Sequence, residues 1–277
     1  RGSVSASTTI SPEGIYNAYR YEENADNGQH FLRTQSIAMS SGLQYTASVF
    51  VKAAELTSVS VGSNNNSIWS AFATFNLSTG LVTAGSGTIE HIGSNWYRCI
   101  VVGLCSTTST NVGIEITTSI GVGSLGDGID VYGAQLEEGS YSTSYIPTSG
   151  TTVTRLADTS STTGLSSVMN DSEGVLYAEI SALSNDGTTK SVSISDGSIT
   201  NQIVIRYSST ANQISAYVTD SGTITASFTY VLSDALSYNK IALKYKVNDV
   251  SLWVNGVEVG TDTSATMPSG FDELNFS

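Results

Sequence analysis

Apolar and polar residues alternate with a period of two along most of this chain, and no stretch of useful length carries the period of an amphipathic helix. In residues 43–53, for example, Tyr45, Val49 and Val51 share one face of an extended segment. Dense clusters of Asn, Gly and Ser separate such segments, and these residues favour turns. The sequence therefore predicts an all-β protein built from antiparallel strands.

The predicted strands fall into two sets that follow one another along the chain. The first set comprises residues 43–53, 68–77, 96–104, 112–118 and 128–136. The second set comprises residues 174–181, 190–194, 202–207, 213–218, 240–245 and 250–254. Strands spaced by roughly eight to a dozen residues, with turns between them, are typical of an antiparallel sandwich. Asn255-Gly256 predicts a tight hairpin, because both central residues of such a turn need a positive φ.

A connector rich in Ser, Thr, Gly and Pro separates the two sets. Such a change of composition marks a domain boundary. We expect a first sandwich over residues 1–146, a linker over residues 147–157 and a second sandwich over residues 158–277. The chain stops at Phe271–Ser277 in what looks like the middle of a strand, so we expect the second sandwich to be incomplete at its C-terminus.

The charge balance narrows the range of partners. The net charge is -13, with 11 Lys and Arg against 24 Asp and Glu. Nucleic acids and anionic lipid surfaces are bound by cations, so this balance argues against both. The chain has no apolar run of 18 residues, and we expect no membrane insertion. Neutral glycans remain the favoured class of partner.

The two cysteines point to synthesis in a reducing compartment. Cys99 and Cys105 lie in one predicted strand, which places their Cα atoms roughly 20 Å apart. A disulfide requires about 7 Å or less, so we expect free thiols. The low share of charged residues, 13%, is nevertheless typical of a robust extracellular β-protein.

Catalytic constellations are not visible in the sequence, and we expect no enzyme activity. Glu137 and Glu138 are adjacent and would point to opposite faces of a strand, which makes a poor acid/base pair. Residues 121–126 match Gly-x-Gly-x-x-Gly, but a strand follows where a dinucleotide site needs a helix. The chain also lacks His-x-His, Cys-x-x-Cys and Gly-x-Ser-x-Gly motifs.

Calcium is the one metal for which the sequence offers ligands, and no cofactor is required by any motif. Calcium binds loop carboxylates and carbonyls. Glu13 and Asp130 are the candidate ligands of a structural calcium ion, and ordinary surface carboxylates are the alternative.

Aromatic residues are the remaining candidates for ligand binding. Sugar rings stack their apolar faces on Trp and Tyr, while planar polar groups hold the hydroxyls. Trp69 follows the polar run 62–67, which predicts a large ring at a loop edge. The candidate glycan-binding residues are Trp69, Tyr19, Tyr21, Arg33 and Tyr97. For each aromatic, the alternative is a position in the core.

Several motifs in the first half occur in the order seen in a known family. They are Ser11–Ala18, Asn27–His30, Tyr45–Ala53, Phe75–Gly80, Asn95–Cys99 and Gly133–Gly139. Together they resemble the jelly-roll, carbohydrate-binding-module-like domain of bacteriophage tail and virion proteins. In the second half, Ile241–Tyr245 and Leu252–Gly260 are similar to concanavalin A-like/laminin-G lectin domains.

These resemblances imply a non-catalytic carbohydrate-binding module of a phage tail-associated adhesin. Its partner would be a cell-surface or environmental polysaccharide, and its place the virion tail, outside the cell, after synthesis in the host cytoplasm. The full-length protein could then form a homo-oligomer. Two alternatives stay open: a structural tail module with no glycan site, and an accessory part of a polysaccharide-degrading enzyme.

Overall fold

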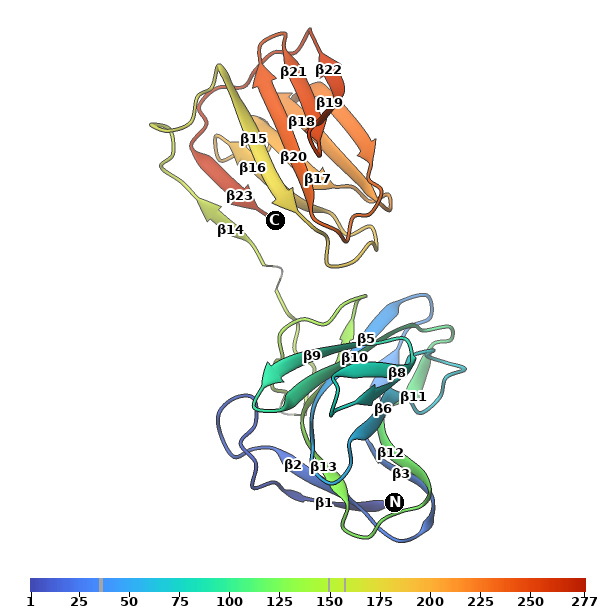
Figure 1. The fold of residues 1–277 in the computed structure, drawn as a ribbon. Helices are drawn as coiled ribbons and strands as arrows, with labels where there is room; N and C mark the ends of the chain where they lie inside the picture. Colours follow the sequence, from blue (N-terminus) through green and yellow to red (C-terminus); the bar gives the residue numbers. More distant parts are fainter. Residues whose placement is uncertain (35–36, 149, 157) are drawn as a thin grey trace. The chain divides into compact units, whose positions relative to one another are not determined.

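The computed structural model describes the chain except residues 35–36, 149 and 157 (Figure 1). Every regular element within the described residues is a β-strand, which confirms the predicted all-β class. No helix of this part of the chain is long and apolar enough to cross a membrane. The chain divides into two compact units, Arg1–Val153 and Thr154–Ser277. Residues 149 and 157 of the predicted linker lie outside the described residues.

The first unit contains two larger antiparallel sheets. The six-stranded sheet has the order β1 (Gly2–Ala6), β2 (Tyr19–Glu23), β13 (Gly128–Glu138), β5 (Gln44–Ala53), β10 (Trp96–Leu104) and β9 (Thr88–Gly93). The five-stranded sheet has the order β3 (Asn27–Arg33), β12 (Ile114–Val122), β6 (Ser58–Ser63), β7 (Phe72–Asn76) and β8 (Leu81–Gly85). A short pair, β4 (Ile37–Met39) with β11 (Ser109–Val112), completes the unit.

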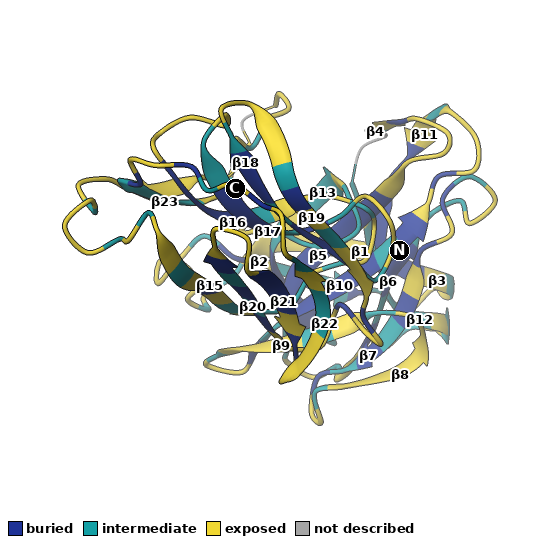
Figure 2. Cartoon of the chain, turned by 90° about the horizontal axis from the view of Figure 1, so that it is seen from above, coloured by how far each residue is buried: buried dark blue, intermediate teal, exposed yellow. Residues whose placement is uncertain are grey.

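Apolar residues from both sheets form one core in the first unit. Val49 and Val51 of β5 are buried together with Val61 of β6 and Phe75 of β7. Cys99 joins this core as a free thiol, and burial raises its pKa to about 12. The edge strand β8 is exposed along its whole length and appears in yellow in Figure 2. The alternation seen in the sequence therefore separates an inner from an outer face on each sheet.

The outer face of the six-stranded sheet carries a second, smaller cluster. Phe50, Trp96 and Tyr132 are buried there, and Tyr145 packs against them. Trp96 and its neighbour Tyr97 point to opposite faces of β10, as their adjacency predicts. The strand residues of this cluster are covered on the outer face by two chain segments, residues 7–18 and 139–147.

The second unit also packs two antiparallel sheets. One has the order β14 (Ser160–Thr162), β23 (Glu273–Phe276), β16 (Lys190–Ser195), β17 (Gln202–Tyr207), β18 (Gln213–Asp220) and β19 (Thr223–Val231). The other has the order β15 (Glu173–Ile180), β20 (Asn239–Lys246), β21 (Val250–Val254) and β22 (Val257–Asp262). Ile203, Ile205, Ile214 and Leu252 are fully buried in the core that both sheets share.

Two hairpins show how the turns are made. Asn255 (φ 51°) and Gly256 (φ 84°) join β21 to β22, which confirms the predicted hairpin. Ser94 (φ 50°) and Asn95 (φ 62°) join β9 to β10 with the same sign of φ but without glycine. A left-handed serine is conformationally unfavourable, so this second turn stores backbone strain.

Candidate functional site

Trp69, the leading aromatic candidate of the sequence, is a core residue. Its side chain is fully buried, and its indole Nε1 donates a hydrogen bond to the Gly103 carbonyl oxygen at 3.0 Å. Trp69 shares the inward-facing parity of Ala71, Ala73 and Phe75, all of them buried. The polar run before it suggested a loop edge, but Trp69 forms an isolated bridge to Cys105 before β7 begins, and its ring lies in the core. The prediction that Trp69 binds a ligand is wrong.

Two of the candidate tyrosines are also occupied by packing. Tyr21 is 2% exposed, and its hydroxyl donates to the Arg1 carbonyl oxygen at 2.8 Å. Tyr97 is half-buried against the core and meets the His91 ring edge-on, with 5.1 Å between centroids. Tyr21 is therefore a core residue, which corrects its assignment as a ligand-binding residue. The ring of Tyr97 is less accessible to a ligand than the ring of an exposed aromatic residue would be.

Tyr19 is the candidate tyrosine that stays accessible, with 56% of its surface exposed. It lies at a small cavity of about 310 Å³ that also includes Val4, Leu32 and Val131. Apart from three tyrosines, this lining is apolar or glycine. Such a lining offers few hydrogen-bond partners for sugar hydroxyls. At this cavity Tyr19 could contribute little to sugar binding beyond stacking.

The two candidate calcium ligands have separate partners. Asp130 is buried, and its two carboxylate oxygens accept hydrogen bonds from Ser7 Oγ at 2.8 Å and Thr9 Oγ1 at 2.7 Å. Glu13 accepts a hydrogen bond from Asn17 Nδ2 at 2.9 Å. The hydroxyl of Tyr132 and this amide lower the pKa of Glu13. Among the described residues, no group of three or more His, Cys, Asp or Glu could hold a metal ion.

Arg33 is the candidate around which the structure gathers further polar groups. It stands opposite Glu115, which in turn stands opposite Gly62. Arg33 Nε and Nη2 both donate to Glu115 Oε2, at 3.1 and 2.5 Å. The guanidinium carbon lies 4.7 Å from the centroid of the Phe31 ring. The Arg33 side chain is thus held flat by a carboxylate and a ring, and 40% of it stays exposed.

The same outer face of the five-stranded sheet carries a wider set of polar and aromatic groups. We call this set the Arg33 face, and it comprises Gln29, Phe31, Arg33, Ser60, Gly62, Phe72, Thr74, Glu115 and Thr117. Gln29 Nε2 donates to Thr117 Oγ1 at 3.2 Å and also to Glu115. Phe72 is 44% exposed and its ring crosses Gly62, where a Cβ would lie 3.2 Å from Phe72 Cδ2.

The Arg33 face combines an exposed ring with planar donors that are already oriented. Glu115 is 8% exposed and was not among the candidates, because its partner Arg33 lies 82 positions away in sequence. Its carboxylate fixes Arg33 and Gln29 rather than facing solvent. An exposed Phe72 on the same sheet face as a positioned guanidinium and amide suits a neutral, hydroxyl-rich ligand that spans several strands.

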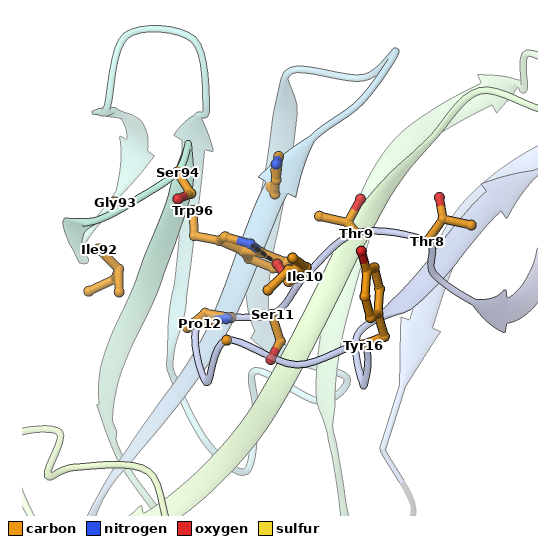
Figure 3. Close-up of a pocket in the computed structure, with 12 residues that line it drawn as sticks. Thr8, Thr9, Ile10, Ser11, Pro12, Tyr16, Ile92, Gly93, Ser94 and Trp96 are labelled. Atoms are coloured by element: carbon orange, nitrogen blue, oxygen red, sulfur yellow. Dashed lines mark hydrogen bonds between the residues drawn. The ribbon is translucent and has the colours of Figure 1, made fainter.

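A pocket lies on the other sheet of the first unit, between the N-terminal loop and the β9–β10 turn (Figure 3). Its volume is about 560 Å³, within the range of small-ligand sites. Tyr16 and Thr9 stand on one side of it, and Ser94 and Ile92 on the other. Lys52 of β5 also lines it.

The second unit exposes an aromatic row that was not among the candidates of the sequence. Tyr177 of β15, Ala242 of β20 and Trp253 of β21 stand in cross-strand register on the outer face of the four-stranded sheet. Tyr177 is 55% exposed and Trp253 is 38% exposed. The short Ala242 side chain between them leaves a shallow gap with a ring on each side. Of the three tryptophans, Trp253 alone is accessible, since Trp96 is 1% exposed.

Comparisons with known proteins give few matches to this chain. A scan against protein-family models gives no match, and neither does a search of curated protein sequences. Among solved structures, the chain is similar to domains LG4–5 of the mouse laminin α1 chain, with 11% identity over 91% of this chain and 79% of that chain. The TM-score is 0.29. A score this low leaves the fold to be defined by the strands themselves, which show antiparallel β-sandwiches.

Proposed function

We propose that this chain is a non-catalytic carbohydrate-binding module and that the Arg33 face of the first unit holds the glycan. The observation that carries this proposal is one cross-strand row of the outer face, which holds the exposed Phe72 of β7 at one end and, beyond Gly62 and Glu115, a guanidinium fixed by Glu115 and Phe31 at the other. Phe72 would stack on the apolar face of a sugar ring. Arg33 and Gln29 would donate hydrogen bonds to its hydroxyls.

The setting we propose is the tail of a bacteriophage, where the module would recognise polysaccharide on a host surface or in its surroundings. The ordered motifs of residues 11–139 support this setting through their resemblance to tail and virion domains. A single shallow site binds weakly. Several copies on one particle would raise the overall strength by effective concentration.

The test is retention of the full chain on a panel of insoluble polysaccharides and on a glycan array, with Arg33→Ala as the site variant. We expect wild type to be retained and Arg33→Ala to lose about tenfold or more in affinity, since hydrogen bonds to charged groups contribute about 1.5–3 kcal/mol. Phe72→Ala should give a comparable loss. Phe72 is already 44% exposed, so this change should leave folding largely unaffected.

A matched control is Arg20→Ala, which also removes one cation and its ion pairs, here with Glu22 and Glu55, but on the six-stranded sheet. It should bind as wild type does. Retention of no glycan by the wild type, together with a stable oligomer in solution, would support a structural tail module instead. Release of sugar products from a retained glycan would support an enzyme.

A further inference from the structure

The pocket of Figure 3 is built independently of the Arg33 face, since it lies on the outer side of the six-stranded sheet. One wall is the loop of residues 8–16. Trp96 Nε1 donates to the Ile10 carbonyl oxygen at 2.9 Å and so ties the middle of this loop to β10. Thr9 is tied to Asp130 of β13 by its hydroxyl. The wall is therefore fixed before any ligand arrives, which lowers the entropy lost on binding.

The opposite wall is the strained turn between β9 and β10. Ser94 lines the pocket with a φ of 50°, a conformation that serine adopts at a cost. Strained residues persist where the surrounding structure holds them, and they concentrate at binding sites. This turn forms one wall of the pocket, and its strained conformation sets the shape of that wall.

Lys52 supplies the charge of the pocket. It stands in one cross-strand row between Asp130 of β13 and Trp96 of β10. Both carboxylate oxygens of Asp130 already accept hydroxyl hydrogen bonds, from Ser7 and Thr9. Within the described part of the chain, no carboxylate lies within ion-pair distance of the Lys52 ammonium. An unpaired lysine at a pocket favours an acidic group brought by the ligand, and this local attraction acts against the net charge of -13, which disfavours anions elsewhere on the chain.

The rim completes the lining needed for a sugar. Tyr16 is 72% exposed, Ile10 is 46% exposed and Ile92 is 44% exposed. These side chains offer apolar surface to the C–H face of a ring. Thr8 and Ser94 offer hydroxyls that both donate and accept.

We propose that this pocket binds a carboxylate-bearing sugar unit, a hexuronic acid of a polysaccharide, with the sugar carboxylate on the Lys52 ammonium and the ring against Tyr16. This inference rests on the proposed glycan-binding function and adds the chemical class of one bound unit. It places a subsite for an acidic sugar on the sheet opposite to the Arg33 face.

The experiment is calorimetric titration of the full chain with a short oligogalacturonate and with the same oligosaccharide after reduction of its carboxyl groups. Wild type should prefer the acidic form. Lys52→Met, which keeps the aliphatic stem, should weaken the acidic form by about tenfold or more and leave the reduced form unchanged. Lys52→Arg should restore part of the loss. The affinity of wild type should also fall with added salt, and that of Lys52→Met should not.

Two further variants keep the result interpretable. Lys190→Met removes the same charge from a lysine of β16 that makes no ion pair among the described residues, and it should bind as wild type does. Tyr16→Ala should weaken both forms of the oligosaccharide, and the high exposure of Tyr16 protects the fold from this change.

The outcomes separate this inference from the proposed function. Equal binding of the acidic form by wild type and Lys52→Met would contradict the proposal that this pocket binds an acidic sugar. Retention of neutral glycans that depends on Arg33, without any binding of oligogalacturonate, also overturns the subsite and leaves the proposed function intact. Lys52-dependent binding of the acidic form, with no effect of Arg33→Ala on any glycan, supports the subsite and removes the Arg33 face from the proposal.

Discussion

The two units place their tryptophans in opposite ways. In the first unit, Trp69 and Trp96 are buried, and both use their indole N–H groups to hold backbone carbonyls. In the second unit, Trp253 lies on an outer sheet face in one row with Tyr177, and its Nε1 donates to the nearby Ser251 hydroxyl. A tryptophan near a polar loop is therefore no sign of a binding surface by itself. What decides is whether another part of the chain covers the ring: Trp96 lies on an outer sheet face and is still buried, because the N-terminal loop covers it.

The difference extends to the groups available for a ligand. The first unit exposes Arg33, Phe72 and the pocket of Lys52 and Tyr16, which are mainly polar or mixed surfaces. The second unit exposes a ring pair with Ala242 between its members. Two sandwiches of the same class thus present surfaces of different chemistry, and the first offers more groups that can recognise hydroxyls and charge.

The largest expected effect is the loss of stability on replacing Trp69. Trp69→Ala should lower the free energy of unfolding of the first unit by about 3–5 kcal/mol, because it opens a cavity in the core. Trp253→Ala should cost the second unit less than about 1 kcal/mol. Denaturant unfolding followed by circular dichroism measures both. A similar cost at both positions would contradict the contrast between a core and a surface tryptophan.

The next effect concerns acid. Burial acts to raise the pKa of Glu23, but hydrogen bonds from Ser119, Thr118 and the Ser124 backbone N–H outweigh it and lower that pKa below 4.5. A carboxyl with a lowered pKa in the folded state stabilises the fold above its ordinary value, and this stabilisation is lost as the pH falls through the lowered value. The first unit should thus lose stability as the pH falls from about 4.5.

Glu23→Gln isolates this contribution. At neutral pH it should cost the first unit about 1.5–3 kcal/mol, since the hydrogen bonds lost are to a charged group. The remaining stability should then depend less on pH below about 4.5. In the second unit, hydrogen bonds from Ser237 and the Leu236 backbone N–H lower the pKa of the exposed Asp234. Backbone N–H groups of Gly164 and Ser166 lower the pKa of Asp272, which is half-buried. Unfolding at pH 7 and pH 3.5 compares the two units, and an equal loss in both would argue against a special role of Glu23.

The smallest effect compares the two hairpin turns and should have opposite signs. Gly256→Ala should destabilise the second unit by about 1–2 kcal/mol, the cost of a left-handed residue with a Cβ. No atom lies within 4 Å of that Cβ position, so the effect is one of the backbone alone. Ser94→Gly should stabilise the first unit by about 0.5 kcal/mol. Thermal melts of the two variants decide, and a destabilised Ser94→Gly would show that the serine side chain contributes more than its strain costs.

The fold class was predictable because alternation is a local signal. Residues two apart share a face whatever the rest of the chain does, and the Asn255-Gly256 turn depends only on its own two residues. Trp69 was assigned wrongly because the polar run before it is a local signal, whereas its burial depends on its bridge to Cys105 and its hydrogen bond to Gly103, 34 positions away.

The candidate sites were less predictable because they depend on contacts between distant residues. Arg33 was a candidate, but Glu115 contacts it, and Phe72 shares its row, only through the register of β3, β12, β6 and β7. Likewise, Lys52 is notable only because Asp130 is already occupied by two hydroxyls from the N-terminal loop. Spacing in the sequence carries no information on such partners.

The distribution of cysteines makes the rate of thiol modification a measure of how often the first unit opens. Both thiols, Cys99 and Cys105, are buried in the first unit, and the second unit has none. A thiol-modifying reagent at neutral pH can react only during moments when the first sandwich opens. The rate of modification thus reports the opening frequency of one unit while the other stays silent, without a probe having to be introduced.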